Sequence, residues 1–276
     1  MIPLVVVDLD GTIVGKDGQV QDCVWQAVAR LSDAGVLVAA CTGRPAFGVA
    51  MRLAARLGPN NPHVFQSGAH IGFPDGPTLK ASSLREQDIR SLIEVSRKTG
   101  AVLEVYTPSS LFVERKTKLS EDHAKLIGVT AIARDLEDVA QHEPVVRAQW
   151  VVPVGEEQPL ILSTPATVTV SHGTSPALPG VAFVNLTRQA VSKASAVSYI
   201  ADYLRVPLED VMGIGDSAGD LPMLEVVGHP RVMANSSPEV LERFGNRPGN
   251  IVGDVEQCGA VRALDEALHL RTAATR

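Results

Sequence analysis

Two carboxylates follow a short apolar run near the start of the chain. The run IPLVVV, residues 2–7, leads directly into DLDGT, residues 8–12. A short apolar run is typical of a strand that is buried on both faces. Residues two apart on a strand lie on the same side, so Asp8 and Asp10 could converge. Convergent carboxylates shift each other's pKa or share a cation, and we favour the cation because the Gly11–Thr12 turn should leave backbone amides free to meet an anion.

Other apolar runs of the chain also end in polar residues. The run at 36–41 leads into Thr42, and the run at 211–215 leads into Asp216. Ligands of open parallel sheets bind beyond the carboxyl ends of the strands. We therefore expect Asp8, Thr42 and Asp216 to lie close together at one edge of a sheet.

The order of apolar runs and helical repeats predicts an α/β core. Strands are expected at residues 2–7, 36–41, 63–66, 211–215 and 231–234, and helices at residues 24–31, 46–57, 190–204, 221–227, 237–244 and 259–270. Pro45 is expected in the first turn of the second helix. Strands that alternate with helices over short connections indicate a Rossmann-like, doubly wound parallel sheet.

The middle of the chain has a different pattern. Strand-like segments alternate polar and apolar residues at 102–106, 111–114, 145–152, 167–171 and 181–185. A capping box at 83–86 predicts a helix that buries Ile89, Leu92 and Ile93 and ends at Gly100, and further helices are expected near 121–127 and 136–141. Such alternation is typical of a sheet with one solvated face. We interpret residues 81–184 as a smaller α+β domain inserted into a core of residues 1–80 and 185–276. The stretch HGTSPALPG, residues 172–180, is expected to be a loop.

The segment DLDGT after a buried first strand resembles the first motif of the haloacid dehalogenase (HAD) superfamily of phosphohydrolases. The resemblance implies that Asp8 is a nucleophile that forms an aspartyl-phosphate, and that Asp10 is the general acid and base. It also implies that Gly11 contributes to phosphate binding. A surface turn that binds calcium, or nothing, is the alternative interpretation of these residues.

Three further segments resemble the remaining motifs of this family, in the family's order. Thr42 and the Gly43 amide resemble the second motif, which holds the transferring phosphoryl group. Lys193, in the sequence VSKAS, resembles the third, a lysine that pairs with the nucleophile and the phosphate. GIGDSAGD, residues 213–220, resembles the last motif, GDxxND. Taken singly, Thr42 could be only a cap and Lys193 only an exposed helical lysine.

The resemblance implies a Mg²⁺ cofactor. Its ligands would be Asp8, the backbone carbonyl of Asp10 and Asp216, with Asp220 supporting them from outside the coordination sphere. Magnesium prefers oxygen ligands and takes few carboxylates because it keeps several waters. Gly219 stands where the family usually has Asn, which removes a polar contact near the phosphate or the inserted domain. The alternative for Asp216 is a helix N-cap.

The inserted segment resembles the larger, type IIB cap of the Cof-type branch. It lies between Thr42 and Lys193, and SGA, residues 67–69, resembles that branch's NGA with Ser67 in place of Asn. Such a cap closes over the site, excludes water and recognises the leaving group of the substrate. Candidate residues for this recognition are Arg44, Arg115, Arg147 and His172, although each could be an ordinary surface or loop residue.

Composition narrows the class of partner. The chain has 276 residues and a net charge of −6 without a basic block, which argues against nucleic acid. Its apolar runs are too short to span a bilayer, and its histidines lack zinc-site spacing. Cys23, Cys41 and Cys258 have no CxxC spacing, so we expect three ordinary small core residues in a reduced cytoplasmic protein.

These observations favour a magnesium-dependent phosphatase that acts on a small phosphorylated metabolite, with a sugar phosphate as the leading substrate class. The protein is expected to be a monomer or a small homo-oligomer that binds neither membrane nor nucleic acid. Two alternatives stay open. One is a phosphomutase of the same superfamily, and the other is a regulatory protein that binds sugar phosphates with weakened catalysis.

Overall fold

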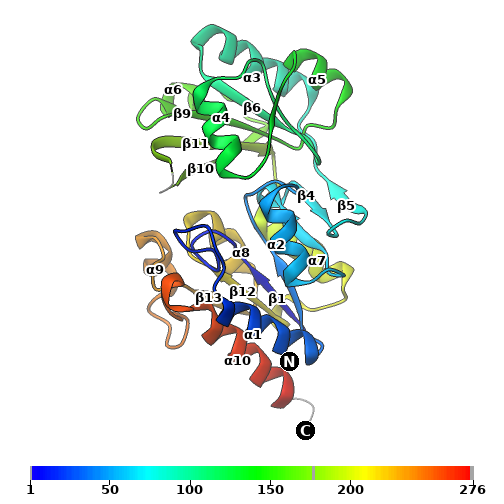
Figure 1. The fold of residues 1–276 in the computed structure, drawn as a ribbon, viewed down its shortest axis with the longest axis vertical. Helices are drawn as coiled ribbons and strands as arrows, with labels where there is room; N and C mark the ends of the chain where they lie inside the picture. Colours follow the sequence, from blue (N-terminus) through cyan, green and yellow to red (C-terminus); the bar gives the residue numbers. More distant parts are fainter. Residues whose placement is uncertain (1, 176–177, 274–276) are drawn as a thin grey trace.

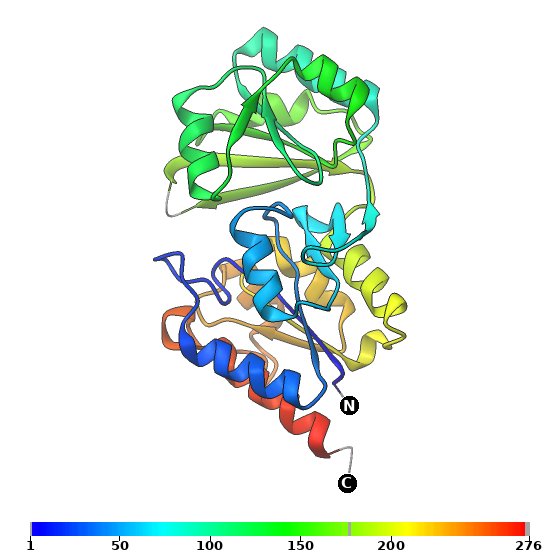
Figure 2. The ribbon, with the colours of Figure 1, turned by 45° about the vertical axis from the view of Figure 1, so that its right-hand side comes forward.

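The computed structural model describes residues 2–175 and 178–273, which form two lobes, one above the other in Figures 1 and 2. The first and the last of the described residues belong to the lower lobe, and the middle of the chain forms the upper lobe. None of the helices in the described part of the chain is long and apolar enough to cross a membrane.

The lower lobe is built on a parallel four-stranded sheet with the strand order β13-β12-β1-β2. Its strands are β1 (Leu4–Val7), β2 (Leu37–Ala40), β12 (Val211–Gly215) and β13 (His229–Val232). Strand β1 lies inside the sheet, with Leu4 opposite Leu37 on one side and opposite Val211 on the other. Every residue of β1 is buried, as its apolar sequence predicts.

Helices cover both faces of this sheet. On one face lie α1 (Asp22–Asp33), α2 (Val49–Leu57) and α10 (Ala260–Ala273), and on the other lie α7 (Lys193–Tyr203), α8 (Leu221–Val226) and α9 (Pro238–Phe244). Val5 and Val7 pack against the first set, whereas Leu4 and Val6 pack against the second. This alternation of side chains along β1 joins the helix layers through the sheet, and the predicted doubly wound core is confirmed.

The upper lobe contains a six-stranded sheet with the order β10-β11-β9-β6-β7-β8. Its strands are β6 (Val102–Tyr106), β7 (Leu111–Val113), β8 (Ala131–Ala133), β9 (Arg147–Pro153), β10 (Val168–Ser175) and β11 (Leu178–Arg188). Apolar side chains of α3 (Glu86–Thr99), α5 (Leu136–His142) and α6 (Glu157–Leu162) cover one face of the sheet. Figure 2 shows the other face turned towards the lower lobe. The inserted segment therefore has the α+β class that the sequence predicted.

The polar face of this upper sheet is buried, so the expectation of a solvated face is wrong at its centre. Glu104, Tyr106, Arg147 and Gln149 are all buried there. The helix α4 (Lys118–Leu126) and the lower lobe cover these side chains. Alternation in sequence reports only that two faces differ in polarity, and it does not report which face meets water.

Several predicted boundaries are wrong for local reasons. Helix α2 begins at Val49 and not in the turn with Pro45, because Gly48 before it has φ +67°, outside the helical range. Helix α3 starts after Arg85 without a side-chain cap, so the capping box at 83–86 does not form. Much of the loop expected at 172–180 is strand, since β10 and β11 pair through it. Residues 176–177 of that loop lie outside the described residues.

The segment at 63–66 contributes a strand outside the main sheet. Strand β3 (His63–Phe65) pairs antiparallel with β4 (His70–Gly72), which pairs with β5 (Thr78–Ala81). A single bridge from Cys41 to Val64 joins this small sheet to the end of β2. The small sheet therefore carries the chain from the core towards the upper lobe (Figure 1).

The cysteines are not all ordinary core residues, which corrects the sequence expectation. Cys41 is free and buried, but Cys23 at the start of α1 forms a disulfide with Cys258 just before α10. Their Cα atoms are 6.4 Å apart, and the bond joins residues 235 positions apart in the sequence. Two helices that pack on the same face of the core sheet are thus covalently joined at one end.

Reduction of this disulfide is expected to destabilise the folded protein. A cross-link limits the unfolded chain and contributes about 2–5 kcal/mol to the free energy of unfolding. Denaturant unfolding with and without dithiothreitol should show that loss for the natural chain. The double variant Cys23→Ser/Cys258→Ser should unfold identically in both conditions. If reductant leaves the natural chain unchanged, the bond makes no contribution.

A buried histidine makes the stability of the core depend on pH. Burial lowers the pKa of His63 to about 4, and its Nδ1 accepts a hydrogen bond of 2.9 Å from the Ala40 amide of β2. Its Nε2 lies 2.9 Å from the Gly58 carbonyl and donates to it. A proton on Nδ1 would break the contact with Ala40, so the folded protein resists protonation.

The sign follows from the unfolded chain, where histidine has a pKa of about 6.5. Between pH 6.5 and 4 the unfolded chain binds this proton and the folded protein does not. The contribution of neutral His63 to stability is therefore complete above pH 6.5. On acidification from pH 6.5 towards 4, the free energy of unfolding falls by about 1.4 kcal/mol per pH unit. Unfolding free energies of His63→Gln should fall less steeply over this range than those of the natural chain. The exposed control His172→Gln should retain the natural slope.

Candidate active site

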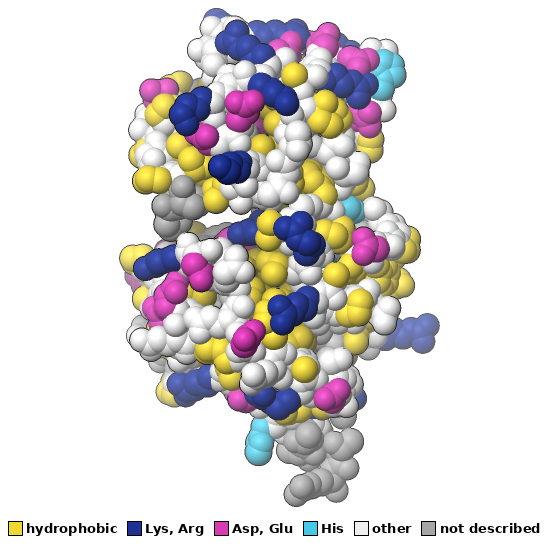
Figure 3. Space-filling model, viewed as in Figure 1, with side chains coloured by type: hydrophobic (Ala, Val, Ile, Leu, Met, Phe, Trp, Pro, Cys, Tyr) yellow, Lys and Arg dark blue, Asp and Glu magenta, His cyan; other side chains and the backbone are white. Residues whose placement is uncertain are grey.

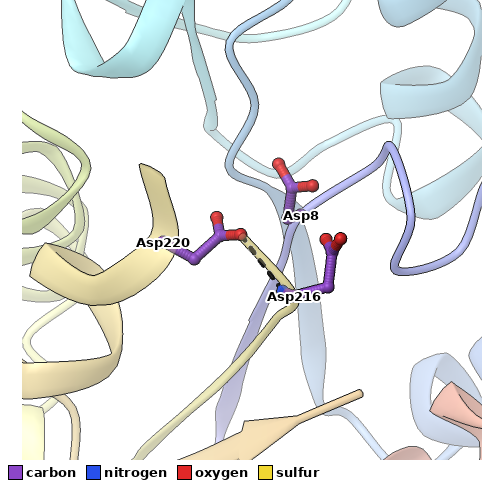
Figure 4. A group of neighbouring side chains, drawn as sticks. All are labelled: Asp8, Asp216 and Asp220. Carbon is purple, nitrogen blue, oxygen red and sulfur yellow. Dashed lines mark hydrogen bonds between the residues drawn. The ribbon is translucent and has the colours of Figure 1, made fainter. Parts of the chain in front are cut away.

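Three carboxylates meet beyond the carboxyl ends of two neighbouring strands. Asp8 follows β1, and Asp216 and Asp220 follow β12. One oxygen from each carboxylate lies within 4.8 Å of the others, and Figure 4 shows the three side chains around a common space. The structure therefore brings together residues that are more than two hundred positions apart. The sequence placed Asp8 and Asp216 at this sheet edge for the same topological reason.

The close approach of the two strand ends requires a glycine. Gly11 has φ +77°, and a Cβ atom there would lie 2.3 Å from Oδ2 of Asp216. The Thr12 hydroxyl donates a hydrogen bond of 2.9 Å to Oδ1 of the same carboxylate. Asn235 donates to the Gly11 carbonyl at 2.8 Å. Asn235 carries no sequence signal because a single Asn after a short strand is common in loops.

The turn at Gly11 does not present the amides that the sequence suggested. The Gly11 N–H donates to the Val14 carbonyl at 3.0 Å, and the Thr12 N–H donates to the Leu9 carbonyl at 3.3 Å. The chain closes a tight turn on itself here and uses its own acceptors. The expectation of free amides at Gly11 and Thr12 is therefore wrong in this structure.

Lys193 is buried between two of the carboxylates. Its Nζ lies 2.6 Å from Asp8 and 2.6 Å from Asp220, and only 6 % of the residue is exposed. It is the first residue of α7, whose start is fixed by a capping box between Ser192 and Ser195. An exposed helical lysine, the alternative interpretation of the sequence, is not what the structure contains.

The turn at residues 66–68 sets the position of that helix start. A Cβ atom on Gly68 would lie 2.3 Å from the Ser192 carbonyl oxygen, so only a glycine permits this contact. The preceding Gln66 and Ser67 also have positive φ, which is uncommon for residues with side chains. The SGA segment thus acts as a close-packed support for Lys193. Ser67 donates its amide to the Thr42 carbonyl at 3.0 Å.

Asp220 holds the loop that carries Asp216. Its Oδ2 accepts from the Asp216 amide at 3.1 Å, from the Ser217 amide at 2.9 Å and from the Ser217 hydroxyl at 2.9 Å. Its Oδ1 binds Lys193. Both oxygens of this fully buried carboxylate therefore already have donors, whereas Asp8 and Asp216 have fewer.

Burial and mutual repulsion favour protonation of the two remaining carboxyls. Burial and the neighbouring Asp220 raise the pKa of Asp8 well above its usual value, although Lys193 opposes this. The same two causes raise the pKa of Asp216 to about 7, and its hydrogen bond from Thr12 opposes them. Like charges in a poorly solvated site are costly unless a cation joins them.

Asp10 lies outside the carboxylate cluster. Its side chain is 56 % exposed and is held by Arg44, whose Nε and Nη2 donate to its two oxygens at 2.7 and 2.5 Å. Arg44 immediately follows the Thr42–Gly43 turn. The sequence placed Arg44 among possible substrate-reading residues, and in this structure it pairs with the predicted acid and base.

The Thr42–Gly43 turn lies at the end of β2, where the sequence placed it. Thr42 is buried, and its hydroxyl oxygen accepts from the Arg44 amide at 3.1 Å. The Gly43 carbonyl accepts from Nη1 of Arg147, which comes from the upper lobe. Arg115 and His172, two other candidates from the sequence, are exposed on the upper lobe. Arg147 is thus the candidate from the inserted segment that the structure brings to the core site.

The donor set fits a divalent cation. Asp8, Asp10, Asp216 and Asp220 bring four carboxylates to this region, and Lys193 and Arg44 bring the two cations that pair with them, which leaves two negative charges. Oxygen donors of this kind suit Mg²⁺. Asp8 and Asp216 have the oxygens to coordinate such an ion, whereas Asp220 is already occupied by its own donors.

Comparison with known proteins identifies the family that the sequence motifs resemble. The family model of the haloacid dehalogenase-like hydrolases matches residues 5–246. The chain is similar to the 5-amino-6-(5-phospho-D-ribitylamino)uracil phosphatase of Bacillus subtilis, with 26 % identity over 87 % of this chain and 90 % of that protein.

Solved structures show the same fold. A phosphatase of the haloalkanoate (HAD) superfamily from Bacteroides thetaiotaomicron matches with a TM-score of 0.79 and 22 % identity, over 97 % of this chain and 95 % of the other. A HAD subclass IIB sugar phosphatase matches with a TM-score of 0.80 and 17 % identity, over 95 % and 98 %. Both comparisons include the two lobes.

Removal of the buried lysine is expected to destabilise the protein strongly. Lys193→Met would leave Asp8 and Asp220 as unpaired buried charges, which costs about 3–5 kcal/mol. Chemical unfolding in EDTA at pH 8 should show this loss, and the loss should shrink at lower pH as the Asp8 carboxyl, whose pKa burial raises, gains a proton. The triple variant Asp8→Asn/Lys193→Met/Asp220→Asn should recover much of the stability. A small, pH-independent loss would contradict the charge argument.

Proposed function

This chain belongs to the haloacid dehalogenase-like hydrolases, and from that membership we propose that it is a magnesium-dependent phosphatase of small phosphorylated metabolites, with sugar phosphates as the leading class. The observation that carries the proposal is the buried Asp8, paired with Lys193 and adjacent to Asp216. A family match over most of the chain supports the activity, and this geometry supplies the groups that the activity needs.

Asp8 is proposed as the nucleophile. One oxygen is held by Lys193 at 2.6 Å, which fixes the carboxylate and leaves the second oxygen for attack on phosphorus. Attack forms an aspartyl-phosphate and releases the alcohol. Water then hydrolyses this acyl phosphate, which releases inorganic phosphate and regenerates Asp8. The high pKa that burial gives Asp8 means that neighbouring positive charge is needed to keep it ionised.

The phosphoryl group is proposed to bind between Lys193 and the Thr42–Gly43 turn. No described acceptor takes the Gly43 N–H, so this amide is available to a phosphoryl oxygen. Because the Thr42 oxygen already accepts from the Arg44 amide, its own hydrogen is directed to another acceptor. Gly11 is proposed to support phosphate binding only through its close packing against Asp216, because its amide already donates to the Val14 carbonyl.

Mg²⁺ is proposed to be held by Asp8, Asp216 and the Asp10 carbonyl, with Asp220 as outer support. Bound there, the ion would neutralise charge on the carboxylates and on the phosphoryl group. The fit rests on the two carboxylate charges that the ion pairs with Lys193 and Arg44 leave unbalanced. It also rests on the pKa of Asp216, which burial and Asp220 raise to about 7 in the absence of such a charge.

Asp10 is proposed to protonate the leaving oxygen and later to deprotonate the attacking water. In this structure its carboxylate is engaged by Arg44 and is largely exposed. Asp10 must therefore exchange Arg44 for the leaving oxygen before it can act. A conformational step before chemistry is common in enzymes whose site closes over the substrate.

Residues 81–184 are proposed to form the cap that covers the site and admits small substrates. In Figure 3 a narrow opening separates the two lobes on one side, next to Lys and Arg side chains. The relative from Bacillus subtilis is named for a phosphorylated ribityl compound, and one structural neighbour is described as a sugar phosphatase. These names support a small hydroxylated phosphate ester as the substrate class.

The proposal predicts that Asp8→Asn abolishes turnover. The amide is a poor nucleophile, so phosphate release from p-nitrophenyl phosphate in Mg²⁺ should fall by at least about 10³-fold while the variant stays folded. Glu94→Gln, at an exposed position of helix α3 in the upper lobe, should retain natural activity. EDTA should abolish activity, and Mg²⁺ should restore it.

A screen of sugar phosphates and other phosphorylated metabolites should identify substrates by the accumulation of inorganic phosphate. Isomerised sugar phosphate without free phosphate would instead indicate a phosphomutase. If the natural chain turns over none of the panel in Mg²⁺ yet binds sugar phosphates, the regulatory alternative replaces the phosphatase.

A further inference from the structure

One side chain of the upper lobe reaches the phosphate-binding turn of the lower lobe. Arg147 is the first residue of β9, and only 3 % of it is exposed. Its Nη1 donates to the Gly43 carbonyl, across 104 positions of sequence. Among the described residues, no carboxylate lies within ion-pair distance of its guanidinium. The fixed acceptor of this buried cation is thus a backbone carbonyl of the other lobe.

The upper lobe orients Arg147 through a buried polar chain. The guanidinium lies 4.0 Å from the centre of the Tyr106 ring, its neighbour across β6 and β9. The Tyr106 hydroxyl donates to Glu104 at 2.6 Å, and Nδ1 of His123 in α4 contacts the same carboxylate at 2.8 Å. Gln149 lies 3.4 Å from it. Tyr106 and Glu104 are therefore held from several sides, and the ring forms a fixed support beneath the guanidinium.

These buried polar neighbours do not satisfy all the hydrogen-bond donors of Arg147. Its Nε is buried and has no hydrogen-bond partner among the described residues. An unsatisfied buried donor costs more than a hydrogen bond contributes, so a purely structural site would usually be filled by an apolar side chain. The arrangement instead keeps a positive charge on the face of the upper lobe that meets the catalytic turn.

The contact between Arg147 and the Gly43 carbonyl restrains one peptide plane. The Gly43 carbonyl and the Arg44 N–H belong to the same planar unit. Its oxygen accepts from Arg147, and its N–H donates to the Thr42 hydroxyl at 3.1 Å. Arg147 therefore restricts the orientation of this plane, and the plane restricts the direction in which the Thr42 hydroxyl can donate.

We propose that Arg147 is a positioning residue through which the cap orders the Thr42–Gly43 turn for the phosphoryl group. When the cap closes, Arg147 binds the Gly43 carbonyl, fixes the Gly43–Arg44 peptide plane and so directs the Thr42 hydroxyl. When the cap opens, that restraint is released. This inference rests on the proposed function and assigns to the cap a part in binding the phosphate itself, beyond selection of the leaving group.

The inference is tested with inorganic phosphate, which has no leaving group. Arg147→Met should weaken phosphate binding, measured by calorimetry in Mg²⁺, on the order of tenfold or more, because a hydrogen bond from a charged group is lost. Arg147→Lys, which keeps the charge and one donor to Gly43, should recover part of the affinity. Arg97→Met, which changes an exposed arginine on helix α3 of the same lobe, should bind phosphate as the natural chain does.

Kinetics separate positioning from recognition of the leaving group. For Arg147→Met, kcat/KM should fall by a similar factor for p-nitrophenyl phosphate and for a sugar phosphate. A loss confined to the sugar phosphate, with unchanged binding of inorganic phosphate, would show that Arg147 reads the leaving group and would overturn the inference. A lower melting temperature with unchanged kinetics and phosphate affinity would assign Arg147 a structural role and would also overturn it.

A double-mutant cycle tests the route through Thr42. If Arg147 acts through this hydroxyl, Arg147→Met should weaken phosphate binding much less in a Thr42→Val background than in the natural chain. Additive losses would contradict the route. If Arg147→Met does not fold, the same cycle is carried out with Arg147→Lys. Absence of turnover in the natural chain would reject the phosphatase, whereas normal phosphate binding by folded Arg147 variants would reject only this inference.

Discussion

The ion triad of Asp8, Lys193 and Asp220 is the interaction on which the rest of the site depends. A buried ammonium group needs two carboxylates at 2.6 Å to remain charged, and these carboxylates need it in turn. Lys193 comes from a segment distant in sequence, so its helix must start at a fixed place. The contact between Gly68 and the Ser192 carbonyl provides that place. The unusual backbone of residues 66–68 therefore has an electrostatic purpose, since it brings the lysine to the strand ends.

Most of the core could be predicted from sequence because β1, β2 and β12 are apolar runs that end in a polar or glycine-rich turn. Strand β13 (His229–Val232) contains His, Pro and Arg, and its prediction at 231–234 was two residues too late. Strand β12 was predicted with its observed ends, Val211 and Gly215, and the convergence of Asp8 with Asp216 follows from parallel topology. Local geometry could not be predicted in the same way. Whether the Gly11 amide is free depends on the closing of its turn onto Val14, and the pairing of Asp10 with Arg44 depends on side-chain positions.

The α+β class of the upper lobe was predicted correctly, but the burial of its polar side chains was not. Its strands alternate in polarity, which suggested a wet face, yet Glu104 and Arg147 are buried where α4 and the lower lobe meet the sheet. The pairing of Cys23 with Cys258 was missed for a similar reason, because spacing along the chain does not report proximity in the fold. In both cases the missing information is which elements pack against which, and a single sequence does not contain it explicitly.

The way the two sheets are interleaved along the chain also constrains the order in which the protein can assemble during its synthesis. All strands of the upper sheet lie between residues 102 and 188, so that sheet can form as soon as this stretch has left the ribosome. Strand β1 emerges first, but its neighbour β12 is made only about two hundred residues later. Until then the apolar β1 has one partner at most, and nascent chains in this state are exposed to aggregation. The insertion thus separates an early-folding unit from a core whose completion waits until β12 has been made.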